Sequence, residues 1–99
     1  MNFNFIISIV IPVYNAKNKI TECLNSLTNQ TSNNFELIFI DDCSTDGTTE
    51  ILKKLENKYK VFYHTKNMGK GAGIRTAVEQ ATGDFVVIQD ADLEYSPDD

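Results

Sequence analysis

The sequence predicts an α/β domain with a doubly wound, mainly parallel sheet and helices on both faces. Three observations support this fold class. Short apolar runs rich in Ile, Val and Phe alternate with segments of helical periodicity, in the order βαβαβαβ. The first two runs are nearly continuous, which is typical of strands buried on both faces. The connections are short, so successive strands are expected to join through right-handed crossovers.

The N-terminal half contains two of the expected strands and one helix. Residues 5–11 form an apolar run that is ended by Pro12, and residues 35–40 form a second run. Between them, apolar residues at helical spacing predict a helix over residues 17–29. The apolar stripe of this helix consists of Ile20, Cys23, Leu24 and Leu27.

The C-terminal half continues the alternation. A helix capped by Ser44 or Asp46 is followed by a short strand at residues 61–64, and a glycine-rich turn then opens a third helix. Gly83 is expected to end this helix, and residues 85–88 form the fourth strand. The apolar stripes of the two helices are Ile51, Leu52 and Leu55, and Ile74, Ala77, Val78 and Ala81.

Composition narrows the classes of function. The chain has 99 residues, 41% hydrophobic and 23% charged, which fits one folded domain and excludes a disordered chain. Its net charge of −5 argues against nucleic acid or an anionic membrane as a partner. The N-terminal residues lack a signal-peptide pattern, and Cys23 and Cys43 are interpreted as reduced thiols. We therefore expect a cytoplasmic location.

Four clusters of chemically active residues follow the predicted strands. In a doubly wound sheet the ligand lies beyond the carboxyl ends of the strands, near the point where the strand order reverses. The clusters at that edge are residues 13–15, 41–46, 65–71 and 90–94. These residues are the candidates for a functional site.

The last of these clusters predicts a divalent metal site. Asp90, Asp92 and Glu94 alternate along an extended segment, so their carboxylates point to one side and repel one another unless a cation joins them. Mg²⁺ or Mn²⁺ suits oxygen ligands, and such ions commonly also hold substrate phosphates. The alternative interpretation is a solvated acidic loop.

The second cluster favours nucleotide binding. An aspartate at the end of a strand, here Asp41 or Asp42, can accept a hydrogen bond from a ribose hydroxyl or a base N–H. The alternative is that Asp46 or Ser44 caps a helix and the aspartate pair only turns the chain. Tyr14 lies just after the first strand, where its ring can stack on a base.

The third cluster favours phosphate binding. The glycines around Gly69 and Gly71 permit close approach of the backbone, while Lys70, Arg75 and the helix N-terminus attract phosphate. The spacing does not match a Walker A loop. The alternative is an ordinary entry turn with surface charges, and His64 is interpreted as a plain surface or half-buried imidazole.

In this order, the four clusters resemble the nucleotide-binding half of a family 2 glycosyltransferase, which has the GT-A fold. The resemblance rests on Ile-Val-Ile-Pro-Val-Tyr-Asn (9–15), Leu-Ile-Phe-Ile-Asp-Asp-Cys-Ser-Thr-Asp-Gly-Thr (37–48), Asn-Met-Gly-Lys-Gly (67–71) and Gly-Asp-Phe-Val-Val-Ile-Gln-Asp-Ala-Asp (83–92). Residues 90–97 are most similar to the dolichyl-phosphate-mannose and polyprenyl-phosphate-glucose synthase branch.

The resemblance implies that the chain binds a nucleotide-diphosphate sugar, linked to UDP or GDP. The base pocket would be formed by Pro12, Val13 and Tyr14. Asp41 and Asp42 would be the acceptors for the base or ribose. Lys70 and Arg75 would face the diphosphate. Asp90 and Asp92 match the Asp-x-Asp motif that holds such a donor through Mg²⁺ or Mn²⁺, and Glu94 falls near that metal.

The resemblance also implies that residues 1–99 are the donor-binding portion of a longer, inverting glycosyltransferase. The general base would lie beyond Asp99. The acceptor would be a polyprenyl phosphate or a glycan. A polyprenyl phosphate acceptor would associate the longer enzyme with a membrane. We expect this portion alone to lack turnover. We also expect an uncovered sheet edge to favour self-association.

Two other classes of protein are compatible with parts of the pattern. A phospho-receiver domain is also doubly wound and carries paired aspartates, although its pair ends the first strand and here that strand ends in Pro-Val-Tyr-Asn. A non-catalytic module that binds nucleotides or partner proteins is the second alternative.

Overall fold

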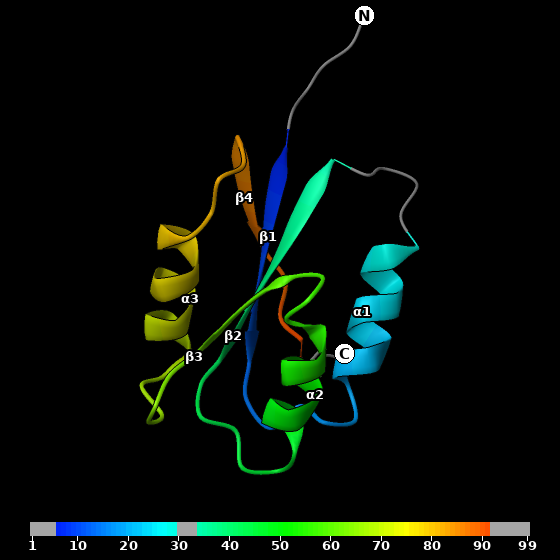
Figure 1. The fold of residues 1–99 in the computed structure, drawn as a ribbon. Helices are drawn as coiled ribbons and strands as arrows, with labels where there is room; N and C mark the ends of the chain where they lie inside the picture. The colour runs from blue at the N-terminus through cyan, green and yellow to red at the C-terminus, as the bar shows by residue number, and fades with distance from the viewer. Residues whose placement is uncertain (1–5, 30–33, 92–99) are drawn as a thin grey trace, which may run out of the picture.

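The computed structural model describes residues 6–29 and 34–91, which form a four-stranded sheet flanked by helices (Figure 1). The strand order is β3-β2-β1-β4, and every neighbouring pair is parallel. The elements are β1 (Ile7–Val13), α1 (Ile20–Thr28), β2 (Phe35–Asp41), α2 (Thr48–Leu55), β3 (Lys60–Tyr63), α3 (Lys70–Glu79) and β4 (Phe85–Ile88). This confirms the predicted fold class and order of elements.

The helices cover both faces of the sheet, as predicted. Figure 1 shows α3 on one side of the sheet and α1 and α2 on the other. The larger core lies under α1 and α2 and includes Ile11, Val13, Ile20, Cys23, Leu27, Leu37, Phe39 and Leu52. The smaller core lies under α3 and consists of Val10, Ile38, Ile40 and Ala77. Alternate residues of β1 and β2 therefore fill the two cores, which explains why these strands are apolar throughout.

The prediction that Pro12 ends the first strand is wrong, because Pro12 pairs with Ile40 inside β1. The carbonyl of Val10 faces β4 and accepts the N–H of Gln89, whereas the carbonyl of Val13 faces β2. Alternation places the Pro12 nitrogen on the β4 side, where the pairing with β4 has already ended opposite Val10. No ladder bond is lost there, so a proline is tolerated.

Gly83 does not end a helix, contrary to the sequence-based prediction. Helix α3 ends at Glu79, and Gly83 instead lies directly against the start of β1. A Cβ on this residue would come within 2.6 Å of the Ile6 carbonyl oxygen and the Ser8 hydroxyl oxygen. The glycine is therefore required by the close approach of two backbones.

Strand β4 is an edge of the described sheet, and its side chains are 43–55% exposed. Only β1 pairs with it among the described residues. The expected uncovered apolar edge is thus present in this part of the chain. Self-association through it stays a prediction.

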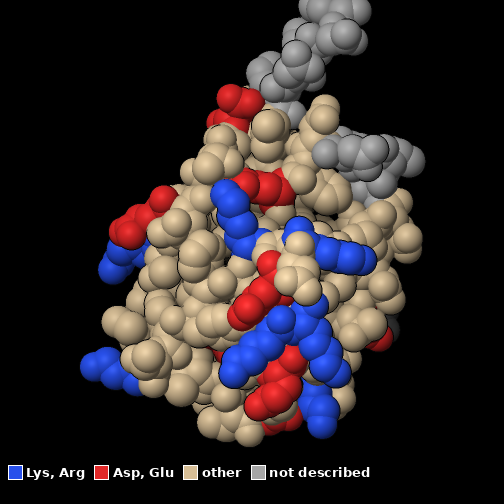
Figure 2. Space-filling model, in the orientation of Figure 1, with Lys and Arg blue, Asp and Glu red and all other residues tan. Residues whose placement is uncertain are grey.

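The described surface carries mixed charge. On the face shown in Figure 2, basic side chains are interspersed with acidic ones. Helix α2 illustrates this, because Glu50 lies within one turn of Lys53 and Lys54. Of the helices that the structure describes, none has both the length and the apolar character needed to cross a membrane.

Glu36 holds together three segments at the amino end of the sheet. Its carboxylate accepts hydrogen bonds from Ser8 on β1 and from the backbone and hydroxyl of Thr82, and it pairs with Lys60 of β3 at 2.9 Å. Burial would raise the pKa of Glu36, but these bonds outweigh burial and lower the pKa to about 2. The carboxylate therefore stabilises the fold only when it is ionised.

Substituting Gly83→Ala tests the close approach at the start of β1. We expect a loss of about 1–3 kcal/mol in the free energy of unfolding, because backbone atoms must move apart. The matched control is Gly71→Ala in α3, where an added Cβ meets nothing within 4 Å. That control should leave stability unchanged or raise it slightly. Urea unfolding of both variants measures the difference, and equal stability would contradict the analysis.

Substituting Glu36→Gln tests the carboxylate that joins the three segments. The folded pKa of about 2 lies below the ordinary value of 4.5, so the stabilisation is complete above pH 4.5 and is lost as the pH falls toward 2. The variant should lose about 2 kcal/mol at pH 7 and show a flatter decline in stability between those pH values. Chemical unfolding across the pH range measures this. Glu50→Gln, at an exposed position of α2, should keep the wild-type profile.

Candidate functional site

A cavity of about 320 Å³ opens at the carboxyl edge of the sheet. It lies where the strand order reverses, since β2 and β3 extend to one side of β1 and β4 lies on the other. Its walls come from the ends of β1 and β2, the turn before α3 together with the first residue of that helix, and the segment after β4. The lining residues are Pro12, Val13, Tyr14, Asp42, Asn67, Gly69, Lys70 and Asp90. The structure thus brings residues of all four clusters together.

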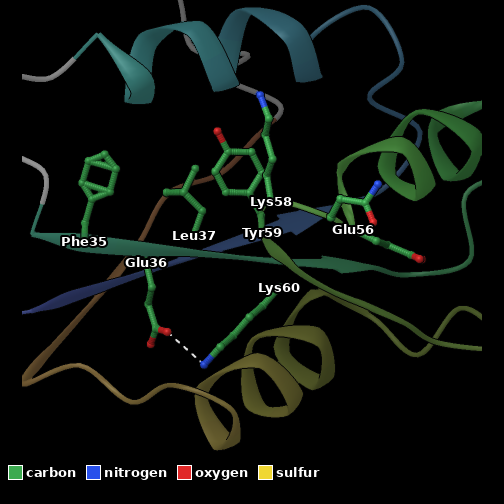
Figure 3. Close-up of a pocket in the computed structure, with 8 residues that line it drawn as sticks. Phe35, Glu36, Leu37, Glu56, Lys58, Tyr59 and Lys60 are labelled. Carbon is green, nitrogen blue, oxygen red and sulfur yellow. Dashed lines mark ion pairs between the residues drawn. The ribbon is translucent and has the colours of Figure 1, made fainter.

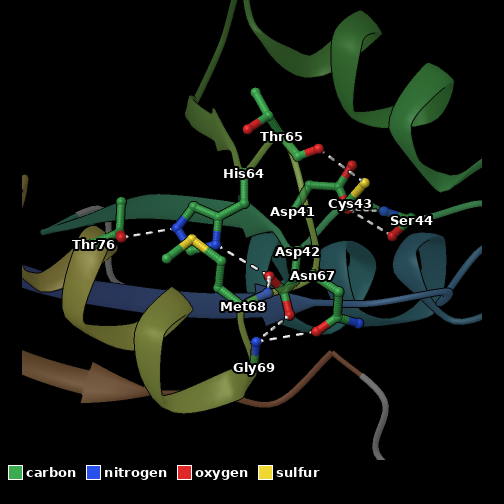
Figure 4. Close-up of polar contacts among 10 residues, drawn as sticks. All are labelled: Asp41, Asp42, Cys43, Ser44, His64, Thr65, Asn67, Met68, Gly69 and Thr76. Carbon is green, nitrogen blue, oxygen red and sulfur yellow. Dashed lines mark hydrogen bonds and ion pairs between the residues drawn. The ribbon is translucent and has the colours of Figure 1, made fainter.

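Asp42 is the acidic residue at the centre of this site, and its side chain is only 8% exposed. One carboxylate oxygen accepts the Met68 N–H at 2.8 Å and the other accepts the Gly69 N–H at 2.9 Å. The first oxygen also contacts the ring of His64 at 3.1 Å (Figure 4). Burial would raise the pKa of Asp42, but these hydrogen bonds hold the pKa below its ordinary value. Asp42 is therefore an ionised acceptor.

Asp41 was predicted beside Asp42 as an acceptor for base or ribose, but it does not line the cavity. Alternation along β2 turns its side chain to the face of α1 and α2, where it is 1% exposed. There it accepts hydrogen bonds from the backbone and hydroxyl of Ser44 and from Thr49. The position of Asp41 in the structure therefore supports a role in shaping the loop after β2.

Arg75 also lies outside the cavity lining. Lys70 is the first residue of α3, and Arg75 follows five residues later on an exposed surface of the helix. Five residues correspond to a rotation of about 140° beyond one full turn, so the two side chains leave the helix in different directions. The structure therefore places only Lys70 at the site.

The loop that presents Tyr14 is fixed by polar contacts with the loop after β2. Asn15 has a positive φ of 49°. Its N–H donates to the Ser44 hydroxyl at 2.9 Å, and its side-chain oxygen accepts the Thr45 N–H at 2.8 Å. The prediction that Ser44 or Asp46 caps this helix is wrong, because the N-cap of α2 is Gly47 in a left-handed conformation. Asp46 lies just before it and accepts the N–H groups of Lys17 and Thr48. Tyr14 as a whole residue remains 48% exposed, and it lines the cavity.

Lys70 and Asp90 both line the cavity and form an ion pair, and both side chains are partly exposed. Asp90 is the predicted metal ligand within the described residues, whereas Asp92 and Glu94 lie outside them. Within residues 6–29 and 34–91, no group of three or more His, Cys, Asp or Glu side chains could hold a metal ion. Of the three predicted metal ligands, the described residues therefore include one, Asp90, and its carboxylate pairs with the Lys70 ammonium group.

His64 was not predicted to contribute to the site. Its ring lies beside Asp42 because β2 and β3 are parallel neighbours, with Asp41 paired to Tyr63. The sequence signal for this contact is that Asp42 and His64 each directly follow a strand, β2 and β3 respectively. Asn67 and Gly69, which also line the cavity, were recognised only as part of the glycine-rich turn.

A second cavity, of about 400 Å³, lies at the other end of the sheet around the start of β2 and β3 (Figure 3). Figure 3 shows that Phe35 and Leu37 point to one side of β2, while Glu36 and Lys60 point to the other and pair there. The Glu36 carboxylate and the Lys60 ammonium group thus neutralise each other. This cavity lacks the converging strand ends of the first one and is not a candidate site.

The sequence of the chain matches one protein family over most of its length. The model of the family described as Glycosyl transferase family 2 matches residues 8–99. The chain belongs to this family. Among its relatives, the putative teichuronic acid biosynthesis glycosyltransferase TuaG of Bacillus subtilis is 34% identical over 98% of this chain. The dolichol-phosphate mannosyltransferase of Pyrococcus furiosus is 34% identical over 93% of it.

Solved structures share the fold as well as the sequence. Residues 1–349 of Staphylococcus aureus TarS in complex with UDP-GlcNAc are 41% identical over 88% of this chain, with a TM-score of 0.79. The mannosyltransferase PcManGT of Pyrobaculum calidifontis, in complex with GDP-Man and Mn²⁺, is 29% identical over 91% of the chain, with a TM-score of 0.82. These neighbours confirm the GT-A fold and decide against a phospho-receiver domain.

The family 2 chain described here spans only part of these proteins. It covers 40% of TuaG and 27% of the Pyrococcus enzyme. It covers 26% of the TarS chain and 28% of the PcManGT chain.

Substituting Asp42→Asn tests the buried carboxylate. The amide retains one acceptor oxygen and places an NH₂ group where an N–H now donates, so we expect a loss of about 1–3 kcal/mol in stability at pH 7. The pKa of Asp42 is lowered from 3.8, so wild-type stabilisation is complete above that pH and is lost as the pH falls below it. Denaturant unfolding between pH 7 and pH 2 measures both effects.

The control for this substitution is Asp84→Asn, in which an exposed carboxylate accepts one backbone N–H, from Ile6. Its loss of stability should be the smaller of the two. Equal losses in the two variants would contradict the central role of Asp42.

Proposed function

We propose that this family 2 chain binds a nucleotide-diphosphate sugar in the cavity at the carboxyl edge of the sheet and presents it for glycosyl transfer. The observation that carries the proposal is the convergence of two carboxylates and one ammonium group in one cavity. These groups are the ionised acceptor Asp42, the cation Lys70 and the carboxylate Asp90. A nucleotide-diphosphate donor offers a matching hydroxyl or N–H, a diphosphate, and oxygens that bind a metal ion.

The nucleoside would bind on the side formed by the ends of β1 and β2. Pro12 and Val13 offer an apolar wall, and the exposed ring of Tyr14 offers a surface on which a base can stack. Asp42 would accept from the ribose hydroxyl or the base N–H. Burial of Asp42 strengthens such a bond because little water competes for it.

The diphosphate would bind at the start of α3. Gly69 and Lys70 line the cavity, and α3 begins at Lys70. The N-terminus of a helix carries unpaired N–H groups and a partial positive charge, which favour phosphate. The Lys70 ammonium group adds a full positive charge within the same cavity.

The carboxylate of Asp90 suits a hard divalent cation, and we propose Mg²⁺ or Mn²⁺ held by Asp90 and Asp92, with Glu94 nearby. When bound, such an ion would neutralise the negative charge that develops on the departing diphosphate. This chain's own residues would orient the donor, with Asp42 fixing the nucleoside and Lys70 the phosphates. The Mn²⁺ bound to the related PcManGT supports this choice of cation.

We infer that the donor is linked to UDP or GDP, since related structures contain UDP-GlcNAc and GDP-Man. The acceptor is proposed to be a polyprenyl phosphate or a glycan, in line with the dolichol-phosphate and teichuronic acid relatives. We further propose inversion at the sugar carbon, with the general base supplied by residues beyond Asp99.

Calorimetric titration with UDP and with GDP, each with and without Mn²⁺, tests this proposal. We expect binding that depends on the metal and weakens at least about tenfold in Asp90→Asn and in Asp92→Asn, because each loses a charged metal ligand. Asp84→Asn is the matched control, since it changes a carboxylate at the opposite end of β4. It should retain wild-type affinity.

Circular dichroism of each protein establishes that it is folded before the titration. Absence of binding to either nucleotide by the folded wild-type chain would contradict the proposal. Binding that is equally strong without metal and in both aspartate variants would contradict the proposed metal site.

A further inference from the structure

The residue that the proposed donor site leaves unexplained is His64. It is the single histidine of the chain, and its side chain is only 9% exposed although it is polar at both ring nitrogens. Nδ1 lies 3.1 Å from a carboxylate oxygen of Asp42, and Nε2 lies 2.9 Å from the hydroxyl oxygen of Thr76 on α3. Figure 4 shows the ring lying between these two partners. His64 does not line the cavity itself.

The contacts of His64 determine how Asp42 can meet a ligand. A carboxylate offers roughly four lone-pair sites. Three groups of the protein already contact the Asp42 carboxylate, namely the His64 ring and the Met68 and Gly69 N–H groups. The Met68 and Gly69 N–H groups come from one turn and bind different oxygens of the carboxylate. The His64 ring follows β3 and contacts the same oxygen as the Met68 N–H. Together these contacts restrain the rotation of the carboxylate plane, and about one lone-pair site remains for a ligand.

The protein also fixes the tautomer of the ring. The carboxylate of Asp42 is ionised and can only accept, so Nδ1 must carry the proton that it donates. In the neutral ring Nε2 is then the acceptor, and the Thr76 hydroxyl donates to it. A hydroxyl can reverse its direction, so Thr76 holds the ring in the same orientation if Nε2 gains a proton.

We propose that His64 is a positioning residue of the donor site, which orients the Asp42 carboxylate toward the ribose hydroxyl or base N–H of the nucleotide. This inference rests on the proposed function, because it assigns Asp42 as the acceptor for that nucleotide. His64 acts on the donor only through Asp42. Thr76 acts one step further away, by fixing the ring.

Two substitutions at His64 separate positioning from simple packing. In His64→Asn the side-chain nitrogen can occupy the place of Nδ1 and still donate to Asp42. In His64→Leu a similar volume is filled without any donor. Both variants remove the contact with Thr76, so they differ mainly in the hydrogen bond from position 64 to Asp42.

The first measurement is the affinity of the wild-type chain and both variants for UDP and GDP in the presence of Mn²⁺. We expect His64→Leu to bind about tenfold more weakly, the loss of one hydrogen bond to a charged group, and His64→Asn to recover most of that affinity. Thermal unfolding of the same proteins records stability. A role in packing alone predicts that affinity follows the loss of stability and falls at least as much in His64→Asn, whose side chain is smaller, as in His64→Leu.

The second measurement is the ¹⁵N spectrum of the His64 ring in the chain without nucleotide. It gives one set of ring signals, because the chain contains one histidine. We expect a ring that carries a proton on Nδ1. We also expect the amide signals of Met68 and Gly69 to shift in His64→Leu and to stay near their wild-type positions in His64→Asn.

The outcomes distinguish the two proposals. If the folded wild-type chain binds neither nucleotide, the proposed function fails, and the positioning of Asp42 is then judged by the ring tautomer and the two amide signals. A ring that carries no proton on Nδ1 would overturn the inference whether or not a nucleotide binds. So would an asparagine variant that behaves like the leucine variant.

Discussion

The site depends on one interaction, the binding of two backbone N–H groups by the buried carboxylate of Asp42. A buried charge is costly unless hydrogen bonds replace its lost hydration, and the N–H groups of Met68 and Gly69 provide them. The same bonds give the turn before α3 a fixed position against the end of β2. Because that turn leads into Lys70, the placement of the cation in the cavity follows from the placement of the carboxylate.

A second carboxylate, on the strand that Asp42 follows, has the equivalent role at the other end of α3. Glu36 and Asp42 lie six residues apart and therefore on the same face of the extended chain, the face that α3 covers. Asp42 holds the turn before the helix, and Glu36 accepts from Thr82 after it. Helix α3 is short, has glycine twice in its first turns and buries little apolar surface, so it has little stability of its own. Its position is set by polar contacts at both ends.

Periodicity was sufficient to predict the order of elements and the edge at which the clusters meet, because both depend on patterns along the chain. The errors have a different origin. Pro12 fits inside β1 because β4 is shorter than β1, and Gly83 is needed because two backbones meet there. Both facts depend on contacts between distant segments. Asp41 and Asp42 were separable in principle, since alternation alone sends them to opposite faces of β2. His64 required knowledge of the pairing register between β2 and β3.

The charges in the cavity constrain the kind of ligand that it suits. Asp42 and Asp90 would repel a bare diphosphate, while Lys70 alone offers one positive charge against two or more negative ones. A diphosphate accompanied by a divalent cation would remove this conflict, because the cation would bind Asp90 and leave Lys70 to pair with the phosphates. The pair that Lys70 and Asp90 form is partly exposed, and such pairs contribute only about 0–1 kcal/mol. Exchanging it for a metal and a phosphate therefore costs the protein little, which supports a donor that binds together with its cation.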